Sequence, residues 1–220
     1  GLEQAVRMGR QGLADYGLEG WIHLDHGPSV ELAQRCLEAG FDSVMIDASE
    51  RPFGENVTVT RRVVELARPY GANVEAELGC VAKLGQRQGG GFTTPEEAAR
   101  FVRETGVDAL AVAIGSAHGF YRETPHLDME RLKAIRAATD AVLVLHGSSG
   151  IPHPMVREAI AAGISKVNLA TEIKDTFMRS LKGVLTASDE IDLRKVFPKA
   201  VEPVTALLEE KYRMTGTARR

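Results

Sequence analysis

The chain has 220 residues, of which 44% are hydrophobic and 26% charged, so it is long enough for one substantial core and is neither disordered nor fibrous in composition. A net charge of -3, without Lys/Arg clusters interleaved with aromatic residues, argues against a nucleic-acid partner. No apolar run approaches the ~20 residues that span a bilayer, and residues 1–12 contain no signal-peptide hydrophobic region. We therefore expect no membrane association and a cytoplasmic location.

Apolar runs of strand length alternate with helical patterns along the whole chain. Strands are expected at 21–27, 43–49, 73–79, 109–115, 141–145 and 166–170. Helices are expected within 1–20, from Ser29 to Gly40, near 57–68, from Thr94 to Gly106, at about 127–138, from Pro154 to Gly163, through Ile173 to Leu181, and at about 198–213. A strand at the start of NVTVT, residues 56–60, is the alternative to the beginning of the helix near 57–68.

The remaining signals concern one loop and the two cysteines. Residues 80–93 read CVAKLGQRQGGGFT, and their three consecutive glycines indicate an irregular loop. Cys36 and Cys80 are too few for a disulfide framework. We expect Cys36 to be a buried apolar residue within its helix.

The expected strands begin 22 to 36 residues apart with one helix in each interval, which predicts a parallel sheet. A TIM (β/α)₈-type barrel and an open doubly wound sheet are the two candidates. The even period, the final helices, polar residues at nearly every strand end and the lack of a GxGxxG turn favour the barrel. Six units fall two strands short of it, and the absence of a linker indicates a single domain over 1–220.

Three histidines follow expected strands: His26, His118 and His146. The carboxyl ends of barrel strands converge on one face, so three imidazoles could hold a divalent metal and leave a position open for substrate, as a catalytic Zn²⁺ site requires. The alternative for each is a hydrogen-bonded structural histidine. His23 is either a partner of a metal ligand or part of the barrel packing.

Carboxylates occur at the same strand ends. Asp25 precedes His26, and on a regular strand the two side chains would point in opposite directions, whereas at a loop start both could reach the pocket. A carboxylate beside a metal-bound carbonyl could transfer the proton of a hydroxyl, and the alternative for Asp25 is a turn cap. Asp47 and Glu77 are candidate alternate metal ligands, acceptors for metal-bound histidines, or structural acceptors of backbone amides.

The last two strand ends carry small residues and hydroxyls that suit a phosphate. Backbone amides in such loops, leading into a helix N-terminus, form the usual phosphate site of a barrel. A turn of small residues needed only for tight packing is the alternative. The candidates are Gly147, Ser148, Ser149, Gly150, Asn168, Leu169, Ala170 and Thr171.

Taken together, HLDHG, MIDAS, VEAELG, AVAIGSAHG, LVLHGSSGI and KVNLATEIK resemble the class II, zinc-dependent ketose-bisphosphate aldolases, closest to the tagatose- and fructose-bisphosphate branch. The resemblance covers the chain from about residue 20. It implies a dimeric or tetrameric TIM barrel that reversibly cleaves a ketose 1,6-bisphosphate into dihydroxyacetone phosphate and an aldehyde, glyceraldehyde 3-phosphate.

The resemblance also implies roles for individual residues. His26, His118 and His146 would hold Zn²⁺, which polarises the ketone and stabilises the enediolate, and Asp25 would be the acid/base. Asp47 and Glu77 match positions that line an alternate metal site. Dihydroxyacetone phosphate would be bound by Gly119, Gly147, Ser148, Ser149, Asn168, Leu169, Ala170 and Thr171. A monovalent cation in addition to Zn²⁺ is an alternative that the sequence leaves open.

Two departures from the family pattern leave other functions open. The first two barrel strands of the family have no counterpart, so the barrel is either truncated, incompletely represented, or completed by another chain. The family also carries an acidic pair after VEAELG, but no acid lies between Glu77 and Glu96 here. The alternatives are an impaired member that binds metal and phosphate ligand without turnover, and an aldolase for a deoxy or sulfonated sugar phosphate.

Overall fold

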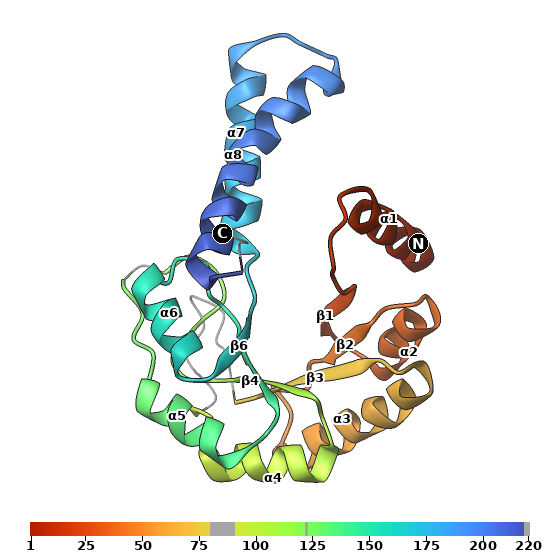
Figure 1. Ribbon diagram of the computed structural model, residues 1–220, viewed down its shortest axis with the longest axis vertical. Coiled ribbons are helices and arrows are strands. Elements are labelled where there is room, and N and C mark those ends of the chain that lie inside the picture. The colour runs from red at the N-terminus through yellow and green to blue at the C-terminus, as the bar shows by residue number, and fades with distance from the viewer. Residues whose placement is uncertain (80–90, 122, 218–220) are drawn as a thin grey trace.

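The computed structural model describes residues 1–79, 91–121 and 123–217, and within them six parallel strands form one sheet in the order β1-β2-β3-β4-β5-β6. The sheet curves through half a barrel, with α2 to α6 on its convex side (Figure 1). The strands are β1 (His23–Gly27), β2 (Ser43–Ile46), β3 (Asn73–Leu78), β4 (Ala109–Val112), β5 (Val142–Leu145) and β6 (Ile164–Val167).

Eight α-helices and one short 3₁₀ helix, Arg68–Tyr70, accompany the strands in the described residues. A helical hairpin of α7 and α8 projects away from the sheet, and α1 lies beyond β1 (Figure 1). The helices are α1 (Leu2–Asp15), α2 (Val30–Glu38), α3 (Phe53–Ala67), α4 (Pro95–Thr105), α5 (Met129–Ala138), α6 (His153–Ala161), α7 (Thr171–Ala187) and α8 (Leu193–Thr215).

Local sequence signals explain where several helices begin and end. Ser29 accepts a hydrogen bond from the Leu32 amide at the start of α2. Thr94 and Glu97 form a reciprocal capping box at the start of α4, which ends at Gly106 in the left-handed conformation. These caps satisfy amide and carbonyl groups that a helix end leaves without partners.

Three boundaries differ from the sequence-based expectation. The strand considered for residues 56–60 is wrong, because α3 already begins at Phe53 and buries Val57, Val63 and Val64 at helical spacing. The last helix begins at Leu193 rather than near 198, since the Asp192 side chain caps it upstream of Pro198. The sixth strand begins at Ile164, two residues before the expected start.

The sheet has an apolar outer face and a polar inner face. On β3, Val74, Ala76 and Leu78 belong to the hydrophobic core beneath the helices. Successive strand residues face opposite sides, so Glu75 and Glu77 point inward, where they are only 2% and 3% exposed. The helices therefore pack on the outer, convex face of the sheet, while charged side chains lie on its concave face.

Two further expectations can be compared with the described residues. No helix there is long and apolar enough to cross a membrane. Cys36 is fully buried in the core, as expected, whereas Cys80 and most of the expected 80–93 loop lie outside the described residues.

Gly115, just after β4, adopts φ 115°, and a Cβ there would lie 2.1 Å from the carbonyl oxygen of His126. We expect Gly115→Ala to lower the free energy of unfolding by about 2 kcal/mol or more, from strain and backbone displacement. Gly54→Ala is the matched control, because its added Cβ would have no atom within 4 Å apart from its chain neighbours and the backbone of its own helix. Urea unfolding measures both, and equal stability of the two variants would contradict the prediction.

Candidate active site

The end of β1 brings two adjacent functional side chains into one pocket. The register of β1 against β2 shifts between Leu24 and Gly27, and His26 has φ 49°, the one positive value among described non-glycine residues. This left-handed conformation costs about 1–3 kcal/mol and is typical of functional positions. On a regular strand the Asp25 and His26 side chains would point in opposite directions, and the left-handed turn at His26 removes that constraint. Both Asp25 and His26 consequently line the same pocket.

Four side chains from four strand ends form a candidate metal-binding group. His26, Glu77, His118 and His146 each offer one ligand atom, and these atoms all lie within 4.8 Å of one another. The ring centroids of His26 and His146 are 4.7 Å apart, and His118 lies 5.0 Å from the first and 5.8 Å from the second. The structure thus brings together the three histidines predicted as ligands, with Glu77 beside them.

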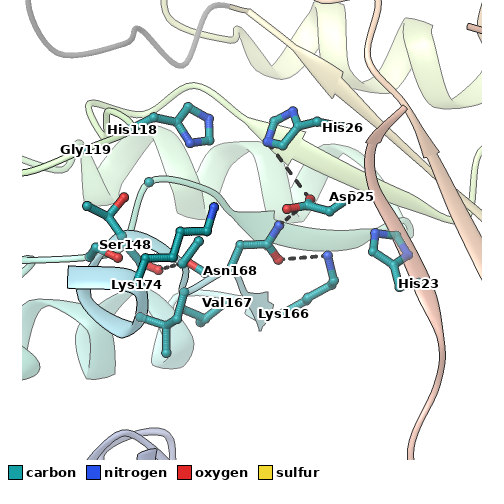
Figure 2. Close-up of a pocket in the computed structure, with 15 residues that line it drawn as sticks. His23, Asp25, His26, His118, Gly119, Ser148, Lys166, Val167, Asn168 and Lys174 are labelled. Atoms are coloured by element: carbon teal, nitrogen blue, oxygen red, sulfur yellow. Dashed lines mark hydrogen bonds and ion pairs between the residues drawn. The ribbon is translucent and has the colours of Figure 1, made fainter. Parts of the chain in front are cut away.

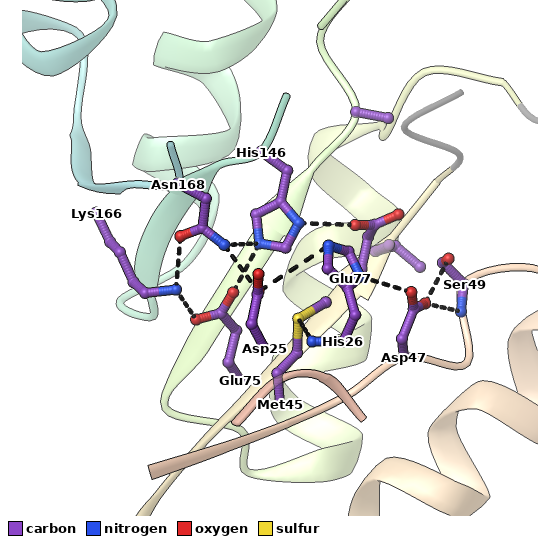
Figure 3. A network of polar contacts seen from close by, with 12 residues as sticks. Asp25, His26, Met45, Asp47, Ser49, Glu75, Glu77, His146, Lys166 and Asn168 are labelled. Carbon is purple, nitrogen blue, oxygen red and sulfur yellow. Dashed lines mark hydrogen bonds and ion pairs between the residues drawn. The ribbon is translucent and has the colours of Figure 1, made fainter. Parts of the chain in front are cut away.

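Carboxylates outside this group hold two of the imidazoles (Figure 3). Asp47 Oδ2 lies 2.7 Å from Nδ1 of His26. Glu75 Oε1 lies 2.8 Å from Nε2 of His146, whose Nδ1 is 3.2 Å from Oε2 of Glu77. In each case the second ring nitrogen remains for the centre of the group, which is how carboxylates orient metal-binding histidines.

This donor set fits a divalent metal such as Zn²⁺, which favours imidazole nitrogen and carboxylate oxygen. Asp47, expected as a ligand or as an acceptor, lies behind His26 and outside the group of four. It also accepts from the backbone amide and hydroxyl of Ser49. Its contacts are those of an acceptor that orients His26.

The charges of the group depend on one another. Burial disfavours protonated His146, but its hydrogen bonds to Glu75 and Glu77 prevail and raise its pKa to about 9. The bond to Asp47 raises the pKa of His26, while burial and the charge of His26 lower that of His118. The cluster therefore favours positive charge near its carboxylates, which a bound cation would supply in place of protons.

The loops after β4, β5 and β6 meet beside this group. The hydroxyl of Tyr121 donates to the Gly147 carbonyl at 2.8 Å and accepts from the Ala117 amide at 2.6 Å. Ser148 Oγ donates to the Asn168 carbonyl, and Ser149 Oγ accepts from the amide of Glu172 in the first turn of α7. These bonds fix the loops around the N-terminus of α7, which favours anions.

A pocket of about 440 Å³ connects the histidines with these loops (Figure 2). Every residue predicted to bind dihydroxyacetone phosphate lines it, as do Asp25, His26 and His118. His23 lines it too, and its Nδ1 lies 2.7 Å from Ser43 Oγ. The structure places the predicted side chains in one space, and their individual roles stay predictions.

Sequence reasoning missed three charged residues of the site. Glu75 and Lys166 connect the strands beneath the pocket, and Lys174 of α7 lines its rim. The period of two along a strand could have indicated the first two, since Glu75 precedes Glu77 and Lys166 precedes Asn168 by two positions. Lys174 has no comparable signal beyond its place in the first turns of a helix.

Fold and site together define a parallel α/β protein with a candidate metal centre beside loops that are predicted to bind an anion. All of residues 1–220 match the family described as Fructose-bisphosphate aldolase class-II. The chain is 41% identical over 203 residues to the fructose-bisphosphate aldolase of Geobacillus stearothermophilus, which covers 90% of this chain and 70% of that protein. The corresponding Staphylococcus aureus protein is 42% identical over 205 residues, with 90% and 71% covered.

Among solved structures, the YdjI aldolase from Escherichia coli K12 matches with a TM-score of 0.78 and 36% identity, covering 88% of this chain and 68% of that one. The chain therefore belongs to the class II fructose-bisphosphate aldolase family. The family resemblance inferred from its strand-end motifs is confirmed.

We expect Asp47→Asn to weaken Zn²⁺ binding by about 10- to 100-fold, because His26 loses the carboxylate that orients its ring and increases its basicity. Competition with a chromogenic chelator measures the affinity. Asp140→Asn, at an exposed position remote from the group, is the control and should bind Zn²⁺ like the parent chain. Equal affinities of all three proteins would contradict an orienting role for Asp47.

Proposed function

We propose that this chain catalyses reversible aldol cleavage of a ketose 1,6-bisphosphate, of the tagatose or fructose type, to dihydroxyacetone phosphate and glyceraldehyde 3-phosphate. The observation that carries the proposal is one pocket lined by Asp25, two of the clustered histidines and the loops at the N-terminus of α7. Proteins named fructose-bisphosphate aldolase at about 41% identity support the same reaction.

Zn²⁺ is the proposed cofactor, held by His26, His118 and His146 with Glu77 as an additional ligand, and it would supply a Lewis acid for the ketone oxygen. Asp47 and Glu75 would keep two of the rings oriented. A monovalent cation is a second candidate cofactor, with no residues assigned to it. The imidazole and carboxylate donors, of which Glu77 and His146 are buried and His26 and His118 half-buried, support a divalent cation more directly than they select zinc.

Asp25 is the proposed acid/base. As the C3–C4 bond breaks, the C4 hydroxyl gives its proton to the carboxylate, and the bonding electrons pass toward the ketone carbonyl. In the reverse direction Asp25 returns this proton to the new hydroxyl. Asn168 Nδ2 donates to Asp25 Oδ1 at 2.9 Å, which holds the carboxylate at the pocket wall. The loop amides and hydroxyls would hold the phosphate of dihydroxyacetone phosphate.

A second candidate follows from the loop after β3, where the family's acidic pair is expected. Residues 80–90 lie outside the described residues, and their sequence contains no Asp or Glu. An impaired member would bind metal and dihydroxyacetone phosphate without cleaving a ketose bisphosphate. Two measurements separate these candidates: calorimetric binding of dihydroxyacetone phosphate, and turnover on tagatose, fructose, deoxy and sulfonated sugar phosphates. Binding without any turnover would indicate the impaired member. Turnover only of a deoxy or sulfonated sugar phosphate would indicate an aldolase for that substrate.

We expect Asp25→Ala to lower kcat for the cleaved bisphosphate by about 10²- to 10⁴-fold, because no group then accepts the hydroxyl proton. Chelation of the metal should abolish turnover, and added Zn²⁺ should restore it. A coupled assay for glyceraldehyde 3-phosphate measures both effects, with Asp140→Ala as the control. Turnover that survives either treatment unchanged would refute the proposed mechanism.

For the fold, we propose that β1 to β6 correspond to six of the eight strands of a TIM barrel, namely the last six strands of the family's barrel. The parallel order and curvature support this, because two more strands between β6 and β1 would close the sheet. Treatment of residues 1–220 as one domain and the cytoplasmic location stay predictions.

The chain is also proposed to form a homo-oligomer, in which a second copy packs against the hairpin of α7 and α8. None of the 17 residues of α7 is buried, although its sequence contains Phe177, Leu181 and Leu185. On α8, Leu193, Phe197 and Val201 recur every four residues and are 60%, 43% and 45% exposed. An exposed stripe at helical spacing is typical of a helix that packs on another.

The apolar stripe, rather than charge, supports a second copy as the partner, because an antiparallel pair of α8 helices about a two-fold axis would cover Leu193, Phe197 and Val201 of both copies. The charges of α8 are largely paired within the chain, Arg194 with Asp192, Lys195 with Glu190 and Arg213 with Glu209.

We expect Val201→Glu to shift the protein from dimer or tetramer toward smaller species, because a carboxylate would be buried in the apolar stripe. Sedimentation equilibrium at several concentrations measures the shift. Ala206→Glu, at an exposed position of the same helix outside the stripe, is the matched control. A parent chain that is monomeric throughout, or an equal effect of both substitutions, would contradict this interface.

A further inference from the structure

A hydrogen bond in the pocket connects the two edge strands of the described sheet. Asp25 lies in β1 and Asn168 directly follows β6, 143 positions away in sequence, yet Asn168 Nδ2 donates to Asp25 Oδ1 at 2.9 Å. The position of the proposed acid/base therefore depends on how the Asn168 amide is held. Figure 3 shows this contact within a larger polar network.

Lys166 determines the orientation of that amide. Its Nζ lies 2.8 Å from Oδ1 of Asn168 and 2.7 Å from Oε2 of Glu75. An ammonium group can only donate hydrogen bonds, so the oxygen of the amide must face Lys166. The amide nitrogen is then turned toward Asp25, and the ambiguity between the two orientations of an asparagine side chain is removed.

The same lysine acts on the metal side through Glu75. This carboxylate is 2% exposed, and its other oxygen lies 2.8 Å from Nε2 of His146. The same Nε2 lies 3.1 Å from Nδ2 of Asn168, so Glu75 and Asn168 hold one side of the His146 ring while its Nδ1 faces Glu77. Charge this deeply buried needs a close counter-ion, and the Lys166 ammonium supplies one.

We propose that Lys166 is a positioning residue that orients His146 through Glu75 and Asp25 through Asn168, and so couples the metal side of the pocket to its proton-transfer side. We call the path through Asn168 to Asp25 the catalytic branch and the path through Glu75 to His146 the metal branch. The catalytic branch rests on the proposed function, whereas the metal branch rests on the contacts of Glu75 alone. Lys166 joins β6 to β3 across 91 positions, and Asn168 continues the connection to β1.

The catalytic branch is tested by a double-mutant cycle on the metal-loaded full chain. Lys166→Met should lower kcat by about 10- to 100-fold, and by a clearly smaller factor in a chain that already carries Asn168→Ala, because the part of its effect that passes through Asn168 is then absent. Lys166→Arg keeps the charge and the donors and should recover most of the loss. Lys133→Met, at an exposed lysine, should leave kcat unchanged.

The metal branch has a readout independent of turnover. Lys166→Met should weaken Zn²⁺ binding about tenfold by chelator competition, and by less than about threefold when Glu75→Gln is present. Thermal unfolding of each variant shows whether it folds, and Lys166→Gln repeats both cycles should Lys166→Met not fold.

Losses of equal size in the single and double backgrounds would overturn the proposal, because Lys166 would then not act through Asn168 or Glu75. Unchanged kcat and unchanged Zn²⁺ affinity in Lys166→Met would overturn it as well. If the parent chain cleaves no ketose bisphosphate, the proposed function fails, and the Zn²⁺ cycle still decides whether Lys166 positions His146.

Discussion

The burial of two carboxylates on the inner face of β3 is the constraint on which the rest of the site depends. Strand periodicity buries Val74, Ala76 and Leu78 under the helices, and the same periodicity forces Glu75 and Glu77 inward. Buried carboxylates require partners of opposite charge or hydrogen-bond donors. His146, which directly follows β5, and Lys166 of β6 provide them, so the packing of the outer face and the chemistry of the inner face have one origin.

Much of this arrangement could be predicted because each strand end is recognisable from a short stretch of sequence. An apolar run followed by His or Asp indicates a strand end, and the ends of parallel strands share one edge of the sheet. The sequence therefore suffices to group His26, His118 and His146. Glu75 and Lys166 were missed because they lie within strands, where a charged residue is ordinarily unexpected. Their pairing spans 91 positions, and no local pattern specifies it.

Other departures have equally local causes. The left-handed conformation of His26 could not be predicted, because histidine is enriched at positive φ but adopts it in only a small fraction of cases, and nothing local distinguishes His26 from the other histidines. This conformation nevertheless decides that Asp25 and His26 share a pocket. The start of α8 was misplaced because Pro198 is a common signal for a first turn, whereas the Asp192 side chain already caps the helix upstream. In both cases a tertiary or capping contact prevailed over the average preference of the residue.

The pocket is also connected to the projecting hairpin through α7, whose first turn forms part of the wall and whose last turn lies near the hairpin tip (Figure 1). The buried Lys211 of α8 lies 2.8 Å from Glu172 Oε2, and the Glu172 amide donates to Ser149 Oγ. One ion pair thus holds α8 against the first turn of α7, beside the loops predicted to bind phosphate. The hairpin proposed as the interface and the predicted phosphate end of the pocket therefore meet at the contact between Lys211 and Glu172.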